Sequence, residues 1–215
     1  MKIRLAAYLQ PDSIVDGEGI RTVIWTQGCP HNCLGCHNPE THDLKGGALV
    51  DLEEVYEIID SLEGQTGITF SGGDPFMQPK ECSEIAKYAR KKGYNIWAYT
   101  GYTFEQLLTL AKTRKEIMDF LKEIDVLVDG KFELAKKNYQ AVFRGSYNQR
   151  IIDVVSSLKE KKAVLVEKYN VSSKTSNRER ASGVYIYWIP FAIVGFVIGL
   201  IWKVAVPAKA QNAAA

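Results

Sequence analysis

The sequence has few cysteines, and its charges nearly cancel. Only four cysteines occur among 215 residues, and the 27 Lys and Arg residues exceed the 25 Asp and Glu residues by two, giving a formal net charge of +2. So small a net charge excludes a basic surface over the whole chain. Nucleic-acid binding depends on such a surface, because it needs clustered Lys and Arg. We therefore expect no nucleic-acid partner.

The amino terminus lacks the long apolar run of a secretory signal, since MKIRLAAYLQPDS is interrupted by charged and polar residues. We therefore expect a cytoplasmic catalytic part. Thiols stay reduced there, and a group of cysteines then binds metal or carries redox chemistry rather than forming disulfides. Apolar residues at 46% and charged residues at 24% exclude general disorder and predict one packed domain, with at most an appendage.

Short β-rich segments alternate with helical patterns between residues 20 and 129. The expected strands are 20–27, 67–70, 95–100 and 125–129, and the expected helices are 51–62, 79–92 and 104–124. Asp51 stands at the cap position of the first helix, with Glu54 three residues later. The alternation indicates βαβ units, a parallel sheet and an α/β fold of the open or closed barrel type.

Each expected strand leads into a polar segment that contains glycine. These segments are TQGCPHNCLGC, SGGDP, TGYT and DGKF. Because parallel strands end at the same edge of a sheet, we expect the four segments to form one site. Cys82 instead shares an apolar helix face with Ile85, Ala86 and Ala89, and is expected in the core.

The carboxyl-terminal part changes character twice. Residues 171–183 are polar, and the nineteen residues from Val184 to Trp202 carry no charge. About 20 such residues cross a bilayer as a helix, so the pattern predicts a membrane span. The expected parts are a catalytic domain (1–168), a polar linker (169–183), a transmembrane helix (184–206) that tethers the cytoplasmic domain, and a tail (207–215).

Three of the four cysteines lie within eight residues. Cys29, Cys33 and Cys36 follow the spacing Cys-x-x-x-Cys-x-x-Cys. Two kinds of metal site are compatible with this spacing. One is a 4Fe-4S cluster with one iron free of protein ligands, and the other is a structural zinc site. The histidines that could complete a zinc site are His31, His37 and His42. Structural zinc sites usually join two separated ligand pairs, whereas these cysteines form one compact group, and this favours the cluster. The open iron of such a cluster keeps a position for a substrate.

The motifs together resemble the radical S-adenosylmethionine superfamily, and within it the family of anaerobic ribonucleoside-triphosphate reductase activating proteins. DGEGIRTVIWTQGCPHNCLGCHNPETH, SGGDPF, IWAYTGYTFEQL, DVLVDGKF and FRGSYNQRIID occur in that family's order, from Asp12 to about Asp153. The resemblance implies an open β/α barrel and an oxidoreductase that binds a 4Fe-4S cluster and S-adenosylmethionine. An electron from reduced flavodoxin or ferredoxin would cleave S-adenosylmethionine, and the 5'-deoxyadenosyl radical would generate the glycyl radical of the large anaerobic ribonucleotide reductase subunit.

The resemblance also assigns roles to single residues. Cys29, Cys33 and Cys36 would ligate the cluster, and Gly35 and His37 would lie against S-adenosylmethionine. Other residues implied near that cofactor are Gly72, Gly73, Asp74, Thr100, Gly101, Asp129 and Lys131. Asp74 stands where many superfamily members have glutamate, in the element that receives the amino group. Lys131 would meet the carboxylate of the cofactor, and Asp129 would hold that lysine or a cation.

Several roles stay open. Asp16, Glu18 and Arg21 are expected to face the incoming protein substrate. FRGSYNQRIID either binds ligand or partner, or locks the last strand by hydrogen bonds. The side chains concerned are Arg144, Ser146, Asn148 and Gln149. Two other functions are possible: activation of another glycyl-radical enzyme such as pyruvate formate-lyase, or a non-catalytic, membrane-tethered metal or redox sensor.

Overall fold

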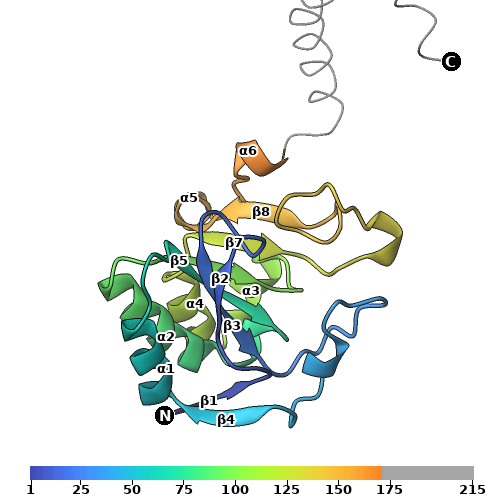
Figure 1. The fold of residues 1–215 in the computed structure, drawn as a ribbon. Helices are drawn as coiled ribbons and strands as arrows, with labels where there is room; N and C mark the ends of the chain where they lie inside the picture. Colours follow the sequence, from blue (N-terminus) through green and yellow to red (C-terminus); the bar gives the residue numbers. More distant parts are fainter. Residues whose placement is uncertain (171–215) are drawn as a thin grey trace, which may run out of the picture. The chain divides into compact units, whose positions relative to one another are not determined.

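An eight-stranded sheet runs through residues 1–170, the part of the chain that the computed structural model describes (Figure 1). Four parallel strands form its centre, in the order β3 (Arg21–Thr26), β5 (Gly67–Gly72), β6 (Asn95–Tyr99) and β7 (Val126–Asp129). They correspond to the four expected strands. The α/β class and the parallel arrangement are therefore confirmed.

Antiparallel strands extend this sheet on both sides. They are β1 (Lys2–Leu5), β4 (Ala48–Asp51) beyond it, β2 (Gln10–Ser13) against β3, and β8 (Arg150–Asp153) against β7. The sequence pattern does not predict β1, β2 or β4, because four residues are too few to show a clear period. Within residues 1–170 no pairing joins β4 to β8, so the strands form an open path and a barrel is not confirmed.

Helices cover one face of the sheet. Figure 1 shows α1 (Leu52–Asp60), α2 (Pro79–Lys91) and α4 (Lys115–Leu121) together on that side, with α3 (Phe104–Leu110) next to them. The expected helix 104–124 is thus two helices, which turn so that Leu107 and Phe120 are both buried. Asp51 precedes α1 but makes no capping hydrogen bond; it pairs with Lys2 at 3.2 Å.

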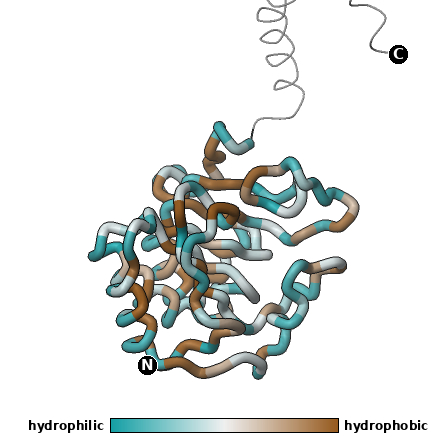
Figure 2. Tube along the Cα trace, viewed as in Figure 1, coloured by the Kyte–Doolittle hydropathy of each residue, from teal (hydrophilic) through white to brown (hydrophobic). Residues whose placement is uncertain are grey.

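Alternating side chains give the sheet two different faces. Ile24, Phe70 and Leu127 point into the main core beneath the helices, and Cys82 on α2 is fully buried there, as predicted. Trp97 and Val128 point the other way, into a smaller cluster. Figure 2 shows apolar segments along the central strands and mainly hydrophilic loops. The larger core therefore lies beneath the helices, and the smaller cluster lies on the opposite face.

The prediction of a membrane tether is wrong for the residues that the structure describes. No helix within residues 1–170 combines the length and the apolar character needed to cross a bilayer. The expected transmembrane helix (184–206) and tail (207–215) lie outside the described residues. The predicted boundary between 168 and 169 falls inside helix α6 (Glu167–Asn170), which follows α5 (Val154–Glu160), and the rest of the linker also lies outside the described residues.

Candidate functional site

A cavity of about 690 Å³ lies at the carboxyl ends of the parallel strands. All four expected loops contribute to its lining, through Cys29, Cys33, Cys36, His37, Gly72, Gly73, Thr100, Gly101 and Gly130. Gly35 does not line the cavity; a Cβ there would lie 3.1 Å from the Leu134 side chain. The parallel strand order therefore brings the loops together, as expected.

The three cysteines occupy the loop between β3 and β4. Their thiols are free and partly exposed. Asn32 and Gly35 adopt left-handed backbone conformations, with φ of 46° and 72°, and the Cys36 N–H donates to the Cys33 carbonyl at 3.1 Å. These turns fold the loop tightly, so that all three cysteines line the same cavity.

Burial controls the protonation of two of these thiols. Desolvation raises the pKa of Cys29 to about 11, and desolvation is also the main reason that the pKa of Cys33 is raised. Backbone N–H groups of His31 and Phe132 act in the opposite direction, on Cys29 and Cys33 respectively. Metal ligation requires thiolates, so loading a metal here would release protons.

The donor set fits a cluster better than a single ion. Within residues 1–170 no three His, Cys, Asp or Glu side chains converge on one point, as a mononuclear zinc site requires. In a 4Fe-4S cluster each cysteine binds a different iron, so the ligands surround a volume. Cys29, Cys33 and Cys36 share one cavity, and Cys82 is buried in the core on the far side of the sheet. The chain thus places three free cysteines at this cavity, and its fourth cysteine lies elsewhere.

The two glycines at the end of β5, Gly72 and Gly73, pack closely against the end of β3. A Cβ on Gly73 would lie 2.5 Å from the Gly28 carbonyl oxygen, and one on Gly72 would lie 2.6 Å from the Thr26 carbonyl oxygen. Gly72 also has a φ of 97°. Glycine is therefore required by the chain's own packing, in addition to any approach of a ligand.

Asp74 is fully buried, and its carboxylate accepts hydrogen bonds from three loops. Oδ2 accepts from His31 Nε2 at 2.6 Å and from the Gly101 N–H at 3.0 Å. The Thr100 hydroxyl lies 2.8 Å from Oδ2, and the Phe76 N–H donates to Oδ1 at 3.0 Å. Asp74 does not line the cavity; it joins the cysteine loop to the ends of β5 and β6.

Asp129 also turns away from the cavity. Its carboxylate accepts from the Phe104 N–H at 2.7 Å and from Arg150 Nε at 2.9 Å, and Arg150 also bonds Glu105 at 2.7 Å. Hydrogen bonds to these carboxylates raise the pKa of Arg150. Lys131 is exposed and does not line the cavity. The expected Asp129–Lys131 pair is thus replaced by Asp129–Arg150.

Only one acid or base of DGEGIR reaches the cavity. Asp16 lines it, whereas Glu18 pairs with Lys168 at 2.7 Å. Arg21 is 1% exposed and donates to the Thr69 hydroxyl at 2.6 Å and to backbone carbonyls. Arg21 therefore holds neighbouring strands together and does not face a partner.

The FRGSYNQR segment is bonded to itself and to its neighbours. Arg144 donates to the carbonyls of Gln149 and Tyr169 at 3.0 and 3.1 Å. The Gln149 side-chain oxygen accepts from the N–H groups of Gly145 and Ser146, and Asn148 donates to the chain as well. Phe143, Arg144, Gly145 and Gln149 also line the cavity. Binding of a ligand or partner and locking of the last strand therefore both stay predictions.

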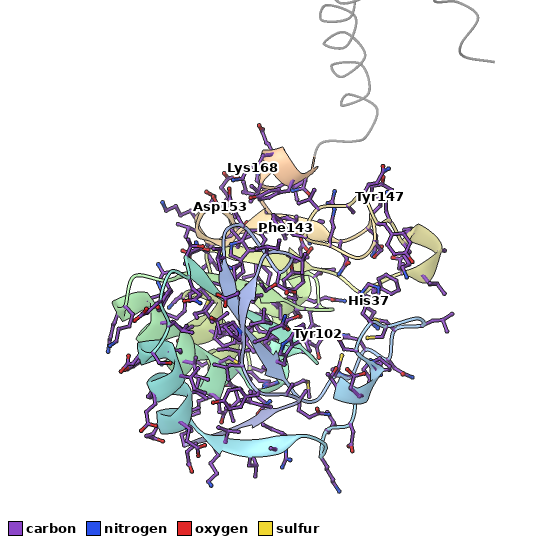
Figure 3. The ribbon with its side chains drawn as sticks, viewed as in Figure 1. His37, Tyr102, Phe143, Tyr147, Asp153 and Lys168 are labelled. Atoms are coloured by element: carbon purple, nitrogen blue, oxygen red, sulfur yellow. The ribbon has the colours of Figure 1, made fainter. Side chains whose placement is uncertain are left out.

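Sequence patterns do not reveal the aromatic side chains of the cavity. Trp25 and Tyr99 stand on the strand face opposite the helices, and Phe132 and Phe143 come from the loop after β7. Tyr99 donates to the Phe143 carbonyl at 2.9 Å. Figure 3 shows His37 between the cysteine loop and the loop after β7, and its ring centroid lies 5.2 Å from that of Phe132. The alternation of side chains along a strand could have indicated that Trp25 and Tyr99 face away from the helices.

Comparison with known proteins assigns the family. The 4Fe-4S single cluster domain matches residues 15–152. The anaerobic ribonucleoside-triphosphate reductase-activating protein of Enterobacteria phage T4 is 36% identical over 152 residues, which cover 66% of this chain and 90% of the relative. The proteins of that name from Pasteurella multocida and Escherichia coli K12 are 33% and 34% identical, over 66% and 65% of this chain and 92% of each relative. The chain therefore belongs to the family of anaerobic ribonucleoside-triphosphate reductase-activating proteins.

Proposed function

We propose that this protein activates anaerobic ribonucleotide reductase by generating a glycyl radical on its large subunit. Cys29, Cys33 and Cys36 would hold a 4Fe-4S cluster that leaves one iron open to S-adenosylmethionine. When bound, the cluster supplies the electron that cleaves S-adenosylmethionine, and the 5'-deoxyadenosyl radical removes a hydrogen atom from glycine. The observation that carries this proposal is the trio of free cysteines in one cavity, with the fourth cysteine buried elsewhere.

The surrounding residues would orient the cofactor and exclude water. The backbones of Gly72 and Gly73 line the cavity without side chains, so a ligand can approach them closely. His37 and Gly101 line it from two other loops. Desolvation raises the pKa of Cys33, and the positive charge of Lys131 partly offsets that effect. The Lys131 ammonium would favour bound thiolates. Reduced flavodoxin or ferredoxin would deliver the electron, and an open β/α barrel remains part of the proposal.

The mouth of the cavity suits a protein substrate. Ile14 and Val15 are each 70% exposed, Tyr139 is 91% exposed, and all three line the cavity. Exposed apolar side chains gathered around a cavity are typical of protein contact sites. We expect the glycine-bearing segment of the partner to enter between them.

The test uses anaerobically reconstituted protein, S-adenosylmethionine, a one-electron reductant and two purified targets. With anaerobic ribonucleotide reductase we expect 5'-deoxyadenosine together with the paramagnetic doublet of a glycyl radical. Pyruvate formate-lyase in the same assay should give no doublet. A doublet with pyruvate formate-lyase alone would show that pyruvate formate-lyase is the target. Bound metal without formation of 5'-deoxyadenosine would contradict the enzymatic function and favour a metal or redox sensor.

A further inference from the structure

Phe132 is a large apolar side chain that lines the cavity but belongs to neither hydrophobic core cluster within residues 1–170. It comes from the loop after β7 and is partly exposed. Phe143, from the same loop, instead packs against Trp97 and Tyr169, at ring-centroid distances of 5.4 and 5.3 Å. Packing within the fold therefore explains the ring of Phe143 but not that of Phe132.

The neighbours of Phe132 hold its ring beside the cysteine loop. Its centroid lies 5.2 Å from that of His37, the residue after Cys36, and the two ring planes are inclined at 45°. Gly145 packs against both rings, since a Cβ there would lie 3.0 Å from Phe132 Cδ2 and 3.4 Å from His37 Cε1. Two rings from different loops thus form one aromatic surface next to a proposed cluster ligand.

The cysteine loop has no aromatic ring of its own to offer at this place. Residues 27–47 contain no Phe, Trp or Tyr, and the turn before Cys36 has no space for one. Gly35 has a φ of 72°, and a Cβ there would lie 3.1 Å from Leu134 Cδ1. The ring next to the cysteines is therefore supplied by the loop after β7.

The remaining aromatic rings of the cavity have other partners or lie at its mouth. Trp25 and Tyr99 each donate a hydrogen bond to another residue, at 3.2 and 2.9 Å, and Tyr139 is 91% exposed. The ring of Phe132 has no polar group and offers its face, and the flat bases of nucleosides stack on such faces. The cavity volume of about 690 Å³ also lies within the range of small-molecule sites.

We propose that Phe132, flanked by His37, stacks on the purine base of the bound cofactor and so positions its adenosyl group next to the cluster cysteines. Gly145 and His37 hold the ring in place before a ligand arrives, so little side-chain freedom is lost on binding. The identity of the base as the adenine of S-adenosylmethionine rests on the function proposed above. The aromatic platform itself does not, because both rings belong to the chain.

The experiment compares Phe132→Ala with wild type, both full length, anaerobically reconstituted and matched in iron content. Equilibrium dialysis measures the dissociation constants of S-adenosylmethionine, 5'-deoxyadenosine and methionine. Those of the two adenosyl ligands should rise about tenfold in the variant, the effect of removing an aromatic ring from a stacked base. That of methionine, which has no base, should not change. Unchanged affinity for the adenosyl ligands, or an equal loss for all three ligands, would overturn the proposal.

Three further variants separate stacking from packing. Phe132→Trp keeps an aromatic face and should bind both adenosyl ligands as wild type does, whereas Phe132→Leu keeps apolar volume without a ring and should resemble Phe132→Ala. Wild-type affinity in Phe132→Leu would show that volume alone matters and would overturn the platform. Tyr147→Ala removes a half-exposed ring from the same loop that does not line the cavity. Figure 3 shows Tyr147 apart from His37, and this variant should bind as wild type does.

The outcomes for the platform and for the proposed function remain distinguishable. If wild type binds 5'-deoxyadenosine through Phe132 but does not cleave S-adenosylmethionine, the proposed function fails and the platform stands. If wild type cleaves S-adenosylmethionine and Phe132→Ala keeps wild-type affinity for it, the function stands and the platform is wrong.

Discussion

Replacing any one of Cys29, Cys33 and Cys36 by alanine should abolish the cleavage of S-adenosylmethionine. Each thiol lines the same cavity, and the described chain offers no other cysteine there. With two ligands left, the cluster would be lost or its geometry destroyed. The measurement is iron and sulfide content after anaerobic reconstitution, together with 5'-deoxyadenosine formed under excess reductant, where both should fall to background.

Cys82→Ala is the matched control, since it removes the same chemical group from the core. Cys82 is a fully buried residue of α2, so the loss of its thiol should lower the free energy of unfolding by about 1 kcal/mol through a small cavity. Iron content and turnover should remain at wild-type levels. If Cys82→Ala lost iron and turnover as completely as the other variants, the assignment of the three ligands would be wrong.

Asp129→Ala should strongly destabilise the protein. It leaves the Phe104 N–H without its acceptor and Arg150 with only Glu105. Breaking a buried, hydrogen-bonded ion pair costs about 3 kcal/mol, the lower end of the range because Arg150 is partly exposed. Urea denaturation of the metal-free protein measures the loss.

Lys131→Ala tests whether Asp129 instead pairs with Lys131, the pairing that the family resemblance implied. Lys131 is exposed and makes no ion pair within residues 1–170, so its loss should change the free energy of unfolding by less than about 0.5 kcal/mol. Equal destabilisation by Asp129→Ala and Lys131→Ala would show that these two residues act together after all.

The sequence predicted the centre of the fold well because periodicity is a local property. Strands β3, β5, β6 and β7 carry β-branched and aromatic residues, and α1 and α2 have clear apolar faces. From parallel strand order alone, the loops that carry the cysteines and glycines could be assigned to one site. The short edge strands gave no such signal.

The pairing of side chains depends on long-range contacts and could not be predicted in the same way. Asp129 and Arg150 are direct neighbours in the antiparallel β7–β8 ladder, so recognition of β8 as the partner of β7 would have revealed their contact. His31 and Asp74 meet only because β3 and β5 are adjacent in the sheet. No local pattern marks His31 as an anchor rather than as a metal ligand.

The most direct test concerns the iron that the chain leaves without a ligand. Electron paramagnetic resonance of the reduced, reconstituted protein should show a cluster signal whose g-values change when S-adenosylmethionine is added. Such a change requires the cofactor to bind at or beside an iron with an open position. A signal that stays the same at saturating S-adenosylmethionine would contradict the proposal, because a fourth side chain would then occupy that position.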